Sequence, residues 1–95
     1  MHILSKKTLI DHWTEYPDCK DQLATWFKIV EKGSWQNANQ LKELFSKSSI
    51  LKDNRMVFRI KSYRLVVRFA FNAQRCFIRW VGTHDDYDKI DANTI

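Results

Sequence analysis

The sequence contains little of the chemistry that cross-links small domains. Among its 95 residues are two cysteines, Cys19 and Cys76, and three histidines, His2, His12 and His84, with no CxxC pair and no ligand-like spacing. This pattern argues against a structural zinc site. Two separated cysteines are most simply reduced thiols in a cytosolic protein, because disulfides persist mainly in oxidising compartments. We therefore expect no metal, no other cofactor and a cytoplasmic location.

Long apolar runs and linker segments are also missing. The first residues, MHILSKK, contain an apolar run of only two residues, so we expect neither a signal peptide nor a membrane span. The sequence has only two glycines and one proline, and it contains no repeat or low-complexity segment. Its 44% hydrophobic and 14% aromatic content is typical of a chain that packs a core. We predict a single domain spanning residues 1–95.

Acidic residues are absent from a long central stretch. No Asp or Glu occurs between Asp53 and Asp85, but this stretch carries seven cations: Arg55, Arg59, Lys61, Arg64, Arg68, Arg75 and Arg79. The net charge is +5; residues 1–47 have seven Lys and Arg against six Asp and Glu, and residues 48–95 have nine against five. Excess basic residues often serve only solubility. Here they are mostly arginines in one region, which favours nucleic acid or an acidic protein as a partner.

Apolar and basic residues alternate through the same stretch. In RMVFRI (55–60) and RLVVRFAF (64–71), alternate positions place one apolar set on the same side: Met56, Phe58, Leu65, Val67 and Phe69. A period of two predicts half-buried strands. We therefore expect a three-stranded antiparallel sheet with one apolar face and one exposed face carrying Arg55, Arg59, Arg64 and Arg68. Such a face suits a polyanion.

Helical spacing precedes these strands. Ser5 is the expected N-cap of a helix in KKTLIDHWTEY (6–16), which Pro17 ends, and a second helix follows and ends at Gly33. The aromatic residues of both helices are predicted to be core residues, so the two helices should form a hairpin over the apolar side of the sheet.

Shorter elements complete the predicted fold. Met1–Leu4 could add an edge strand, a short helix is expected near Ala38–Phe45, and Ser46–Asn54 is predicted to be a polar connection. Thr83 should cap a last short helix, with Asp86 three residues on in a capping-box pattern. The predicted fold class is α+β, with an N-terminal helical hairpin packed on a small, mainly antiparallel β-sheet and a short C-terminal helix.

A histidine and a tyrosine follow the last strand. His84 and Tyr87 are three residues apart, which places them on one face of a helix near the cationic face. Together with an arginine they are enough for RNA cleavage without a metal, in which a ribose 2′-OH attacks the adjacent phosphate. That reaction needs a group to take one proton, a group to give another, and a cation to stabilise the phosphorane. Histidine suits either proton step, and arginine matches phosphate oxygens. The alternative is a helix-capping histidine and a tyrosine that only packs by its ring.

Two segments, RLVVRF after Tyr63 and the closing IRWVGTHDDYDKID, resemble the HigB-type toxins of bacterial toxin–antitoxin pairs, within the RelE-like ribonuclease superfamily. The resemblance extends over nearly the whole chain. It implies a RelE-like fold and an mRNA interferase that acts on messages in the ribosomal A site, next to ribosomal RNA. It also implies a cognate HigA-type antitoxin with a helix-turn-helix DNA-binding domain.

The resemblance also implies site residues. By position, Arg64 would contact the scissile phosphate, His84 would stand where many relatives carry arginine, and Tyr87 would replace their C-terminal tyrosine. We predict Arg64, His84 and Tyr87 as catalytic residues, with His84 as the base for the 2′-OH. The predicted RNA-binding residues are Arg55, Arg59, Lys61, Arg68 and Arg79. We also expect neighbours such as Arg59 and Arg79 to hold the guanidinium of Arg64 in place. The alternative from a different class is a catalytically silent RNA- or partner-binding module on the same scaffold.

Overall fold

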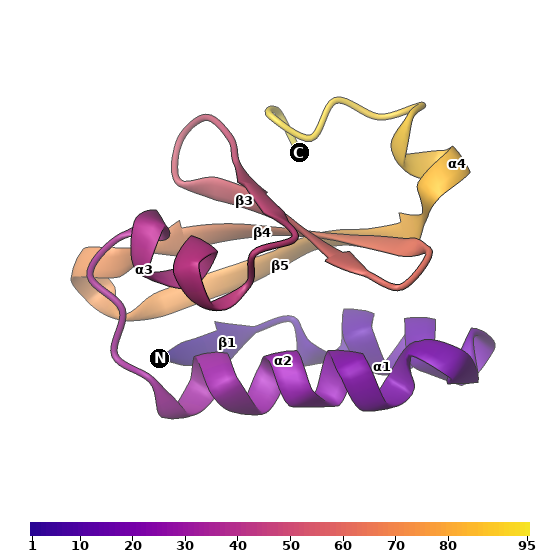
Figure 1. Ribbon diagram of the computed structural model, residues 1–95, viewed down its shortest axis with the longest axis horizontal. Coiled ribbons are helices and arrows are strands. Elements are labelled where there is room, and N and C mark those ends of the chain that lie inside the picture. Colours follow the sequence, from indigo (N-terminus) through magenta and orange to yellow (C-terminus); the bar gives the residue numbers. More distant parts are fainter.

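The computed structural model describes residues 1–95 as a five-stranded sheet with helices around it (Figure 1). The strand order is β1-β5-β4-β3-β2. The elements, in chain order, are β1 (His2–Leu4), α1 (Lys6–Glu15), a 3₁₀ turn at Pro17–Cys19, α2 (Lys20–Lys32), α3 (Ala38–Leu44), β2 (Ser48–Ile50), β3 (Arg55–Ile60), β4 (Tyr63–Ala70), a 3₁₀ turn at Phe71–Ala73, β5 (Arg75–Thr83) and α4 (His84–Tyr87). The predicted α+β fold class is confirmed.

The sheet is mainly antiparallel. Strands β3, β4 and β5 pair antiparallel as expected, and β1 adds a parallel edge strand beside β5. The prediction that Ser46–Asn54 is only a connection is wrong, because β2 forms there and pairs with β3. Strand β2 has three residues, two of them serines, and it lies at the edge of the sheet. A segment this short and polar shows no apolar alternation, so its sequence does not predict a strand.

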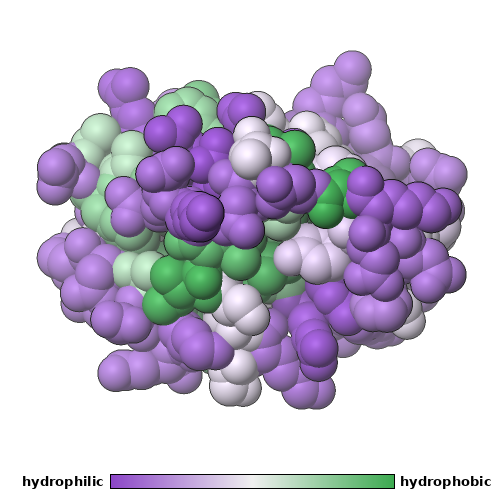
Figure 2. Space-filling view, turned by 90° about the horizontal axis from the view of Figure 1, so that it is seen from above, coloured by the Kyte–Doolittle hydropathy of each residue, from purple (hydrophilic) through white to green (hydrophobic).

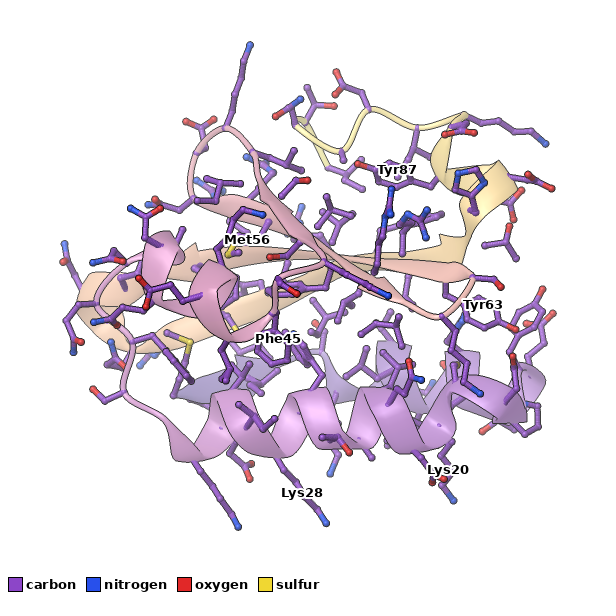
Figure 3. The ribbon with its side chains drawn as sticks, in the orientation of Figure 1. Lys20, Lys28, Phe45, Met56, Tyr63 and Tyr87 are labelled. Atoms are coloured by element: carbon purple, nitrogen blue, oxygen red, sulfur yellow. The ribbon has the colours of Figure 1, made fainter.

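Helices α1 and α2 cover one face of the sheet and bury its apolar side (Figure 1). All five residues predicted to face inward are at most 2% exposed: Met56, Phe58, Leu65, Val67 and Phe69. Trp26 of α2 packs edge-on against Phe58, with ring centroids 5.4 Å apart. Helix α3 contributes Leu41, which is fully buried, and Phe45 at its end packs edge-on against Phe58, with ring centroids 5.4 Å apart. Figure 3 shows Phe45 and Met56 near α3.

The helix ends follow the predicted positions but not always the predicted chemistry. Helix α1 stops before Pro17, and Gly33 is the C-cap of α2. Ser5 precedes α1 with a φ of 71° and makes no side-chain cap hydrogen bond. Thr83 does cap α4, since its Oγ1 accepts the N–H of Asp86 at 3.2 Å. None of the helices is both long and apolar enough to cross a membrane.

The second face of the sheet is partly covered by the C-terminal segment that follows α4 (Figure 1). Ala92 packs on Val57 and Val66 in a small second core. Leu51, Trp80, Tyr87 and Ile95 pack around these three residues. The main-chain N–H of Lys52 donates to Asn93 Oδ1 at 2.9 Å and fixes the segment to the loop before β3. Apolar groups accordingly appear between polar ones on this side of the molecule (Figure 2).

The prediction of one continuous exposed face of arginines is wrong, because the C-terminal segment covers the middle of that face. Val57 and Val66 occupy the middle of that face, and the alternation placed them there correctly. Their burial, at 8% and 0% exposed, requires a covering segment, which the periodicity did not predict. The cations therefore lie in two groups, at either end of a small apolar centre.

Candidate active site

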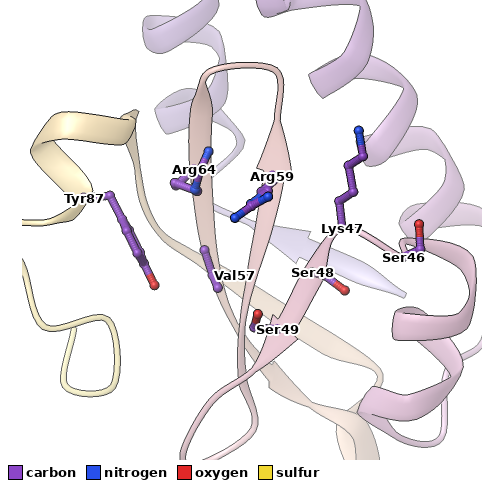
Figure 4. A pocket seen from close by; sticks show the side chains of 8 residues that line it. All are labelled: Ser46, Lys47, Ser48, Ser49, Val57, Arg59, Arg64 and Tyr87. Atoms are coloured by element: carbon purple, nitrogen blue, oxygen red, sulfur yellow. The ribbon is translucent and has the colours of Figure 1, made fainter.

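A cavity of about 330 Å³ opens at one end of the second face, between strands β2, β3 and β4 and helix α4 (Figure 4). The hairpin strands supply two arginines, and the turn into β2 supplies a lysine and serines. The lining residues are Ser46, Lys47, Ser48, Ser49, Val57, Arg59, Arg64 and Tyr87. The lining contains three cations and no carboxylate.

The strand register brings the two arginines together. Arg59 of β3 and Arg64 of β4 are directly opposite each other, and Gly82 of β5 is opposite Arg64 on its other side. Arg64 Nη1 donates to the carbonyl of Tyr63 at 3.1 Å, which holds the half-buried guanidinium in place. The ion pairs of the structure involve Arg55, His84 and Lys89, so neither pocket arginine has a carboxylate partner. Like charges directly opposite are destabilising, and a bound anion would relieve that repulsion.

Tyr87 completes the pocket from the far side. Helix α4 starts at the Thr83 cap and carries the Tyr87 ring against Trp80, with ring centroids 6.0 Å apart. Figure 4 shows the ring extending from the α4 side toward the strands that carry Arg64 and Val57. A phenol and two guanidiniums around one cavity can bind a phosphate by charge and by hydrogen bonds.

Comparisons with known proteins identify the family of the chain. Residues 19–90 match the family model of the HigB toxin, described as the RelE-like toxic component of a toxin–antitoxin system. The chain belongs to the HigB toxin family. It is 33% identical over 96 residues to the mRNA interferase toxin HigB of Escherichia coli K12, covering 97% of this chain and 92% of that protein. The mRNA interferases HigB of Escherichia coli O157:H7 and Shigella flexneri have the same identity and coverage.

His84 lies apart from the other predicted catalytic residues of this HigB-family protein. It is the first residue of α4, its side chain is 55% exposed, and Nδ1 is 3.7 Å from Asp85 Oδ1. It is not among the residues that line the Arg59–Arg64 pocket. Its main-chain N–H donates to the carbonyl of Ser62 at 3.0 Å, so the start of α4 is tied to the β3–β4 turn. The structure thus brings Arg64 and Tyr87 together and leaves His84 on the hairpin side of the pocket.

Arg55 is not on the exposed surface. Its side chain is buried, Nε donates to the main-chain oxygen of Ile95 at 2.6 Å, and Nη1 is 3.6 Å from Asp53 Oδ2. The expectation of an exposed Arg55 is therefore wrong. The alternation gave its face correctly, but the C-terminal segment and the Asp53 carboxylate cover it.

Arg79 also departs from its expected place beside Arg64. A bulge in β5 makes Val66 pair with Trp80 and Val67 pair with Ile78, so Arg79 is the extra residue between them. Arg79 lines a separate cavity with Arg68. Because the bulge and Gly82 separate it from the Arg59–Arg64 pair, the predicted support of Arg64 by Arg79 is wrong.

Lys61 lies in the tight turn between β3 and β4, with a φ of 54°, and is exposed. It lines neither the Arg59–Arg64 pocket nor the cavity that Arg68 and Arg79 share.

The structure also reveals pocket residues that the sequence reasoning missed. Lys47 and its serine neighbours reach the cavity from the turn into β2. The main-chain N–H of Arg59 donates to the carbonyl of Lys47 at 2.9 Å, which fixes the turn beside the arginine pair. Nothing in the spacing of the SKSS segment indicates this, because the pairing of β2 with β3 is a tertiary contact. The one available signal was its composition, a lysine among small hydroxyl residues.

Proposed function

We propose that this protein is an endoribonuclease that cleaves messenger RNA on the ribosome and so inhibits translation as the toxin of a toxin–antitoxin pair. The observation that carries the proposal is the acid-free pocket holding the Arg59–Arg64 pair and Tyr87 in a chain of the HigB family. The names of the Escherichia coli and Shigella flexneri relatives supply the reaction class.

The proposed reaction is an internal phosphoryl transfer that requires no metal. The ribose 2′-oxygen attacks the adjacent phosphorus, the P–O5′ bond breaks, and the products are a 2′,3′-cyclic phosphate and a 5′-hydroxyl. One proton leaves the 2′-OH and one is delivered to the 5′-oxygen, so the protein needs a base and an acid. Arg64 is the cation for the phosphorane, because its fork matches two phosphate oxygens and it is already held in position.

The proton transfers are assigned to Tyr87 and His84. Tyr87 lies in the pocket, so its hydroxyl is the proposed donor to the 5′-oxygen. His84 is two residues beyond Gly82, the residue opposite Arg64, and is the proposed base for the 2′-OH when RNA lies across the hairpin end of the pocket. Arg59 and Lys47 are the proposed contacts to the phosphates next to the scissile one.

The proposed partner is a HigA-type antitoxin with a helix-turn-helix domain, which would present an acidic segment to the same unpaired cations. The second candidate function is an RNA-binding module without catalysis, favoured by the exposed position of His84 outside the pocket lining.

Analysis of the cleavage products tests the proposed function. Purified protein is mixed with ribosomes programmed with a defined message, and the new RNA ends are identified by mass spectrometry. Internal 2′-OH attack leaves a 5′-hydroxyl on the downstream fragment, whereas attack by water with the opposite leaving oxygen leaves a 5′-phosphate. Ribosome binding with an intact message would support the silent binding module. The Arg64→Ala protein serves as the control for contaminating nucleases.

A further inference from the structure

We infer that Arg55 is a positioning residue: it holds the C-terminal segment (residues 88–95) over the sheet, and this segment holds Tyr87 in the cleavage pocket. The inference rests on the proposed function, because it concerns the residue to which delivery of a proton is assigned there. Arg55 would then act inside the protein, whereas the sequence predicted an RNA contact for it.

The guanidinium of Arg55 is buried at the start of β3. A buried charge is stable only when it is paired and hydrogen-bonded, and two partners meet these needs. Nη1 is 3.6 Å from Asp53 Oδ2, and Nε donates to the main-chain oxygen of Ile95 at 2.6 Å. Asp53 and Asn54 have φ values of 54° and 59°, a tight turn from which the Asp53 carboxylate reaches back to Arg55. Arg55 therefore joins the loop before β3 to the end of the C-terminal segment.

The same loop holds the C-terminal segment at a second point. The main-chain N–H of Lys52 donates to Asn93 Oδ1 at 2.9 Å, and next to Asn93 the side chain of Ala92 packs on Val57 and Val66. Figure 1 shows the segment running from α4 back toward this loop. The far end of the segment is thus fixed, and its near end is α4.

The position of Tyr87 depends on both ends of α4. The helix spans His84–Tyr87, a single turn, and so short a helix is not stable without tertiary contacts. Its start is tied to the β3–β4 turn, and its end continues directly into the C-terminal segment, where the N–H of Ile90 donates to the carbonyl of Tyr87 at 3.2 Å. Tyr87 also packs on the second core, to which the segment contributes Ala92. Release of the segment would therefore free the end of α4 and the Tyr87 ring.

Matched variants test this role. Arg55→Met keeps a long side chain but removes the charge and the donor to Ile95, and Asn93→Ala removes the acceptor of the second bond at a half-buried position. Arg75→Met is the control, because Arg75 is exposed on β5 and lines neither cationic cavity. Circular dichroism melting verifies that each variant is folded. If Arg55→Met does not fold, Asn93→Ala carries the same measurements.

On programmed ribosomes, Arg55→Met should lower the maximal cleavage rate at least about tenfold, since a displacement of about 1 Å at a reacting group can cost a hundredfold. The ribosome concentration that gives half the maximal rate and the salt slope of ribosome binding should stay parental. Loss of a phosphate contact would instead raise that concentration and reduce the slope by about one. Asn93→Ala should act in the same direction as Arg55→Met, and Arg75→Met should cleave at the parental rate.

The route through Tyr87 is tested by combining Arg55→Met with Tyr87→Phe. Changes that act through one group are not additive, so Arg55→Met should reduce the rate of Tyr87→Phe much less than it reduces the parental rate. Equal reductions in the two backgrounds would overturn the inference. A parental rate in folded Arg55→Met, or a reduced salt slope with a parental maximal rate, would overturn it as well.

A measurement without RNA separates this inference from the proposed function. The rings of Trp80 and Tyr87, with centroids 6.0 Å apart, should give nuclear Overhauser contacts in the parent and in Arg75→Met. Arg55→Met should lose these contacts. A parent protein that cuts nothing would contradict the proposed function, whereas retained ring contacts in Arg55→Met would contradict the positioning role.

Discussion

At the scale of single residues, Arg64 combines an unpaired charge with a fixed position. Its strand is flanked by β3 and β5, and its guanidinium is held by the carbonyl of Tyr63 at 3.1 Å. The side chain is half-buried, so water screens its charge less than it screens a fully exposed arginine. A preorganised cation of this kind stabilises charge that develops in a transition state without having to reorganise.

Arg64→Ala should lower the single-turnover rate of mRNA cleavage on programmed ribosomes by about a hundred- to a thousandfold. Ribosome binding should fall much less, because other cations remain. Arg64→Lys restores charge without the planar fork, so it should stay clearly impaired. Arg75→Ala is the matched control and should cut at the parental rate. A folded Arg64→Ala protein with parental activity would remove Arg64 from the active site.

Tyr87 has a packing role and a proposed chemical role, and one substitution separates them. Tyr87→Phe keeps the ring beside Trp80 but removes the hydroxyl, so the melting temperature should be unchanged. If the hydroxyl delivers a proton, the cleavage rate should fall by roughly a hundred- to ten-thousandfold, the range for general acid–base catalysis. His84→Gln should show a comparable loss with no loss of stability, because the His84 side chain is exposed. Parental rates in Tyr87→Phe would leave the tyrosine a packing residue only.

His12 makes the stability of the fold dependent on pH. It is buried beside the rings of Tyr16 and Tyr63, whose centroids are 4.8 and 4.9 Å from the centroid of the His12 ring. The Nε2 atom of His12 has no hydrogen-bond partner. Burial lowers the pKa of His12, and nearby Glu15 and Asp18 offset part of that shift. Figure 3 shows Tyr63 on the side of the sheet that faces the helices. Its hydroxyl donates to Asp18 at 2.8 Å, and this bond raises the pKa of Tyr63 to about 12.

The unfolded chain therefore takes up the His12 proton more readily than the folded protein does. The free energy of unfolding should be highest above the ordinary histidine pKa of about 6.5 and should decrease as the pH falls below it, until the lowered pKa of the folded state is passed. Urea unfolding at pH 7.5, 6.5 and 5.5 would measure this decrease. His12→Phe should flatten it, whereas His84→Gln should not. An equal pH dependence in His12→Phe would place its origin elsewhere.

At the scale of elements, the two faces of β4 have different surroundings. Its inward residues join the main core, and its outward residues alternate between the cationic pockets and the small second core. Phe69 is a suitable residue for testing the inward face, because it is 2% exposed. The centroid of its ring is 6.3 Å from that of Phe58 and 5.2 Å from that of Phe71, on which it stacks.

Phe69→Ala should lower the free energy of unfolding by about 3–5 kcal/mol, a large share of the stability of a small domain. Ile50→Ala is a suitable control, because Ile50 is 45% exposed and should cost far less. Urea unfolding of both variants provides the measurement. A Phe69→Ala protein as stable as the parent would mean that the faces of β4 are inverted.

At the scale of the whole molecule, the net charge of +5 is not spread evenly. Four of the five arginines without ion pairs line the two cavities on the side opposite the α1–α2 layer: Arg59, Arg64, Arg68 and Arg79. The fifth, Arg75, is exposed and lies outside both cavities. The molecule therefore has one side suited to binding a polyanion, whereas the other face of its sheet packs against α1 and α2.

Ribosome association should weaken steeply with added salt, because each phosphate contact releases counterions. With one phosphate contact from each of the four arginines that line these cavities, the slope of log affinity against log salt should be about three in magnitude. Binding measured between 50 and 200 mM potassium chloride would test this expectation. Affinity that is indifferent to salt would mean that the arginines contact groups other than phosphates.

Residue order alone determined the inner half of this protein. The period of two in residues 55–60 and 64–71 placed Met56, Phe58 and Leu65 in the core, because a strand that buries one face must alternate. Helix limits at Pro17 and Thr83 followed from local backbone chemistry. The RLVVRF and GTHDDYDKI segments indicated the family, and alternation placed Arg64 on the face of the sheet away from the core.

Tertiary structure decided the outer face, because its features depend on segments that meet only after folding. The C-terminal segment covers Val57 and Val66 and takes Arg55 out of the surface, and no local pattern in residues 88–95 indicates that contact. The β5 bulge leaves Arg79 without a partner on β4, and Arg79 lines the cavity of Arg68 instead of the pocket of Arg64. The pairing of β2 with β3 brings Lys47 to the pocket. Alternation gives the face on which a side chain lies, but only the packed molecule decides what else covers that face.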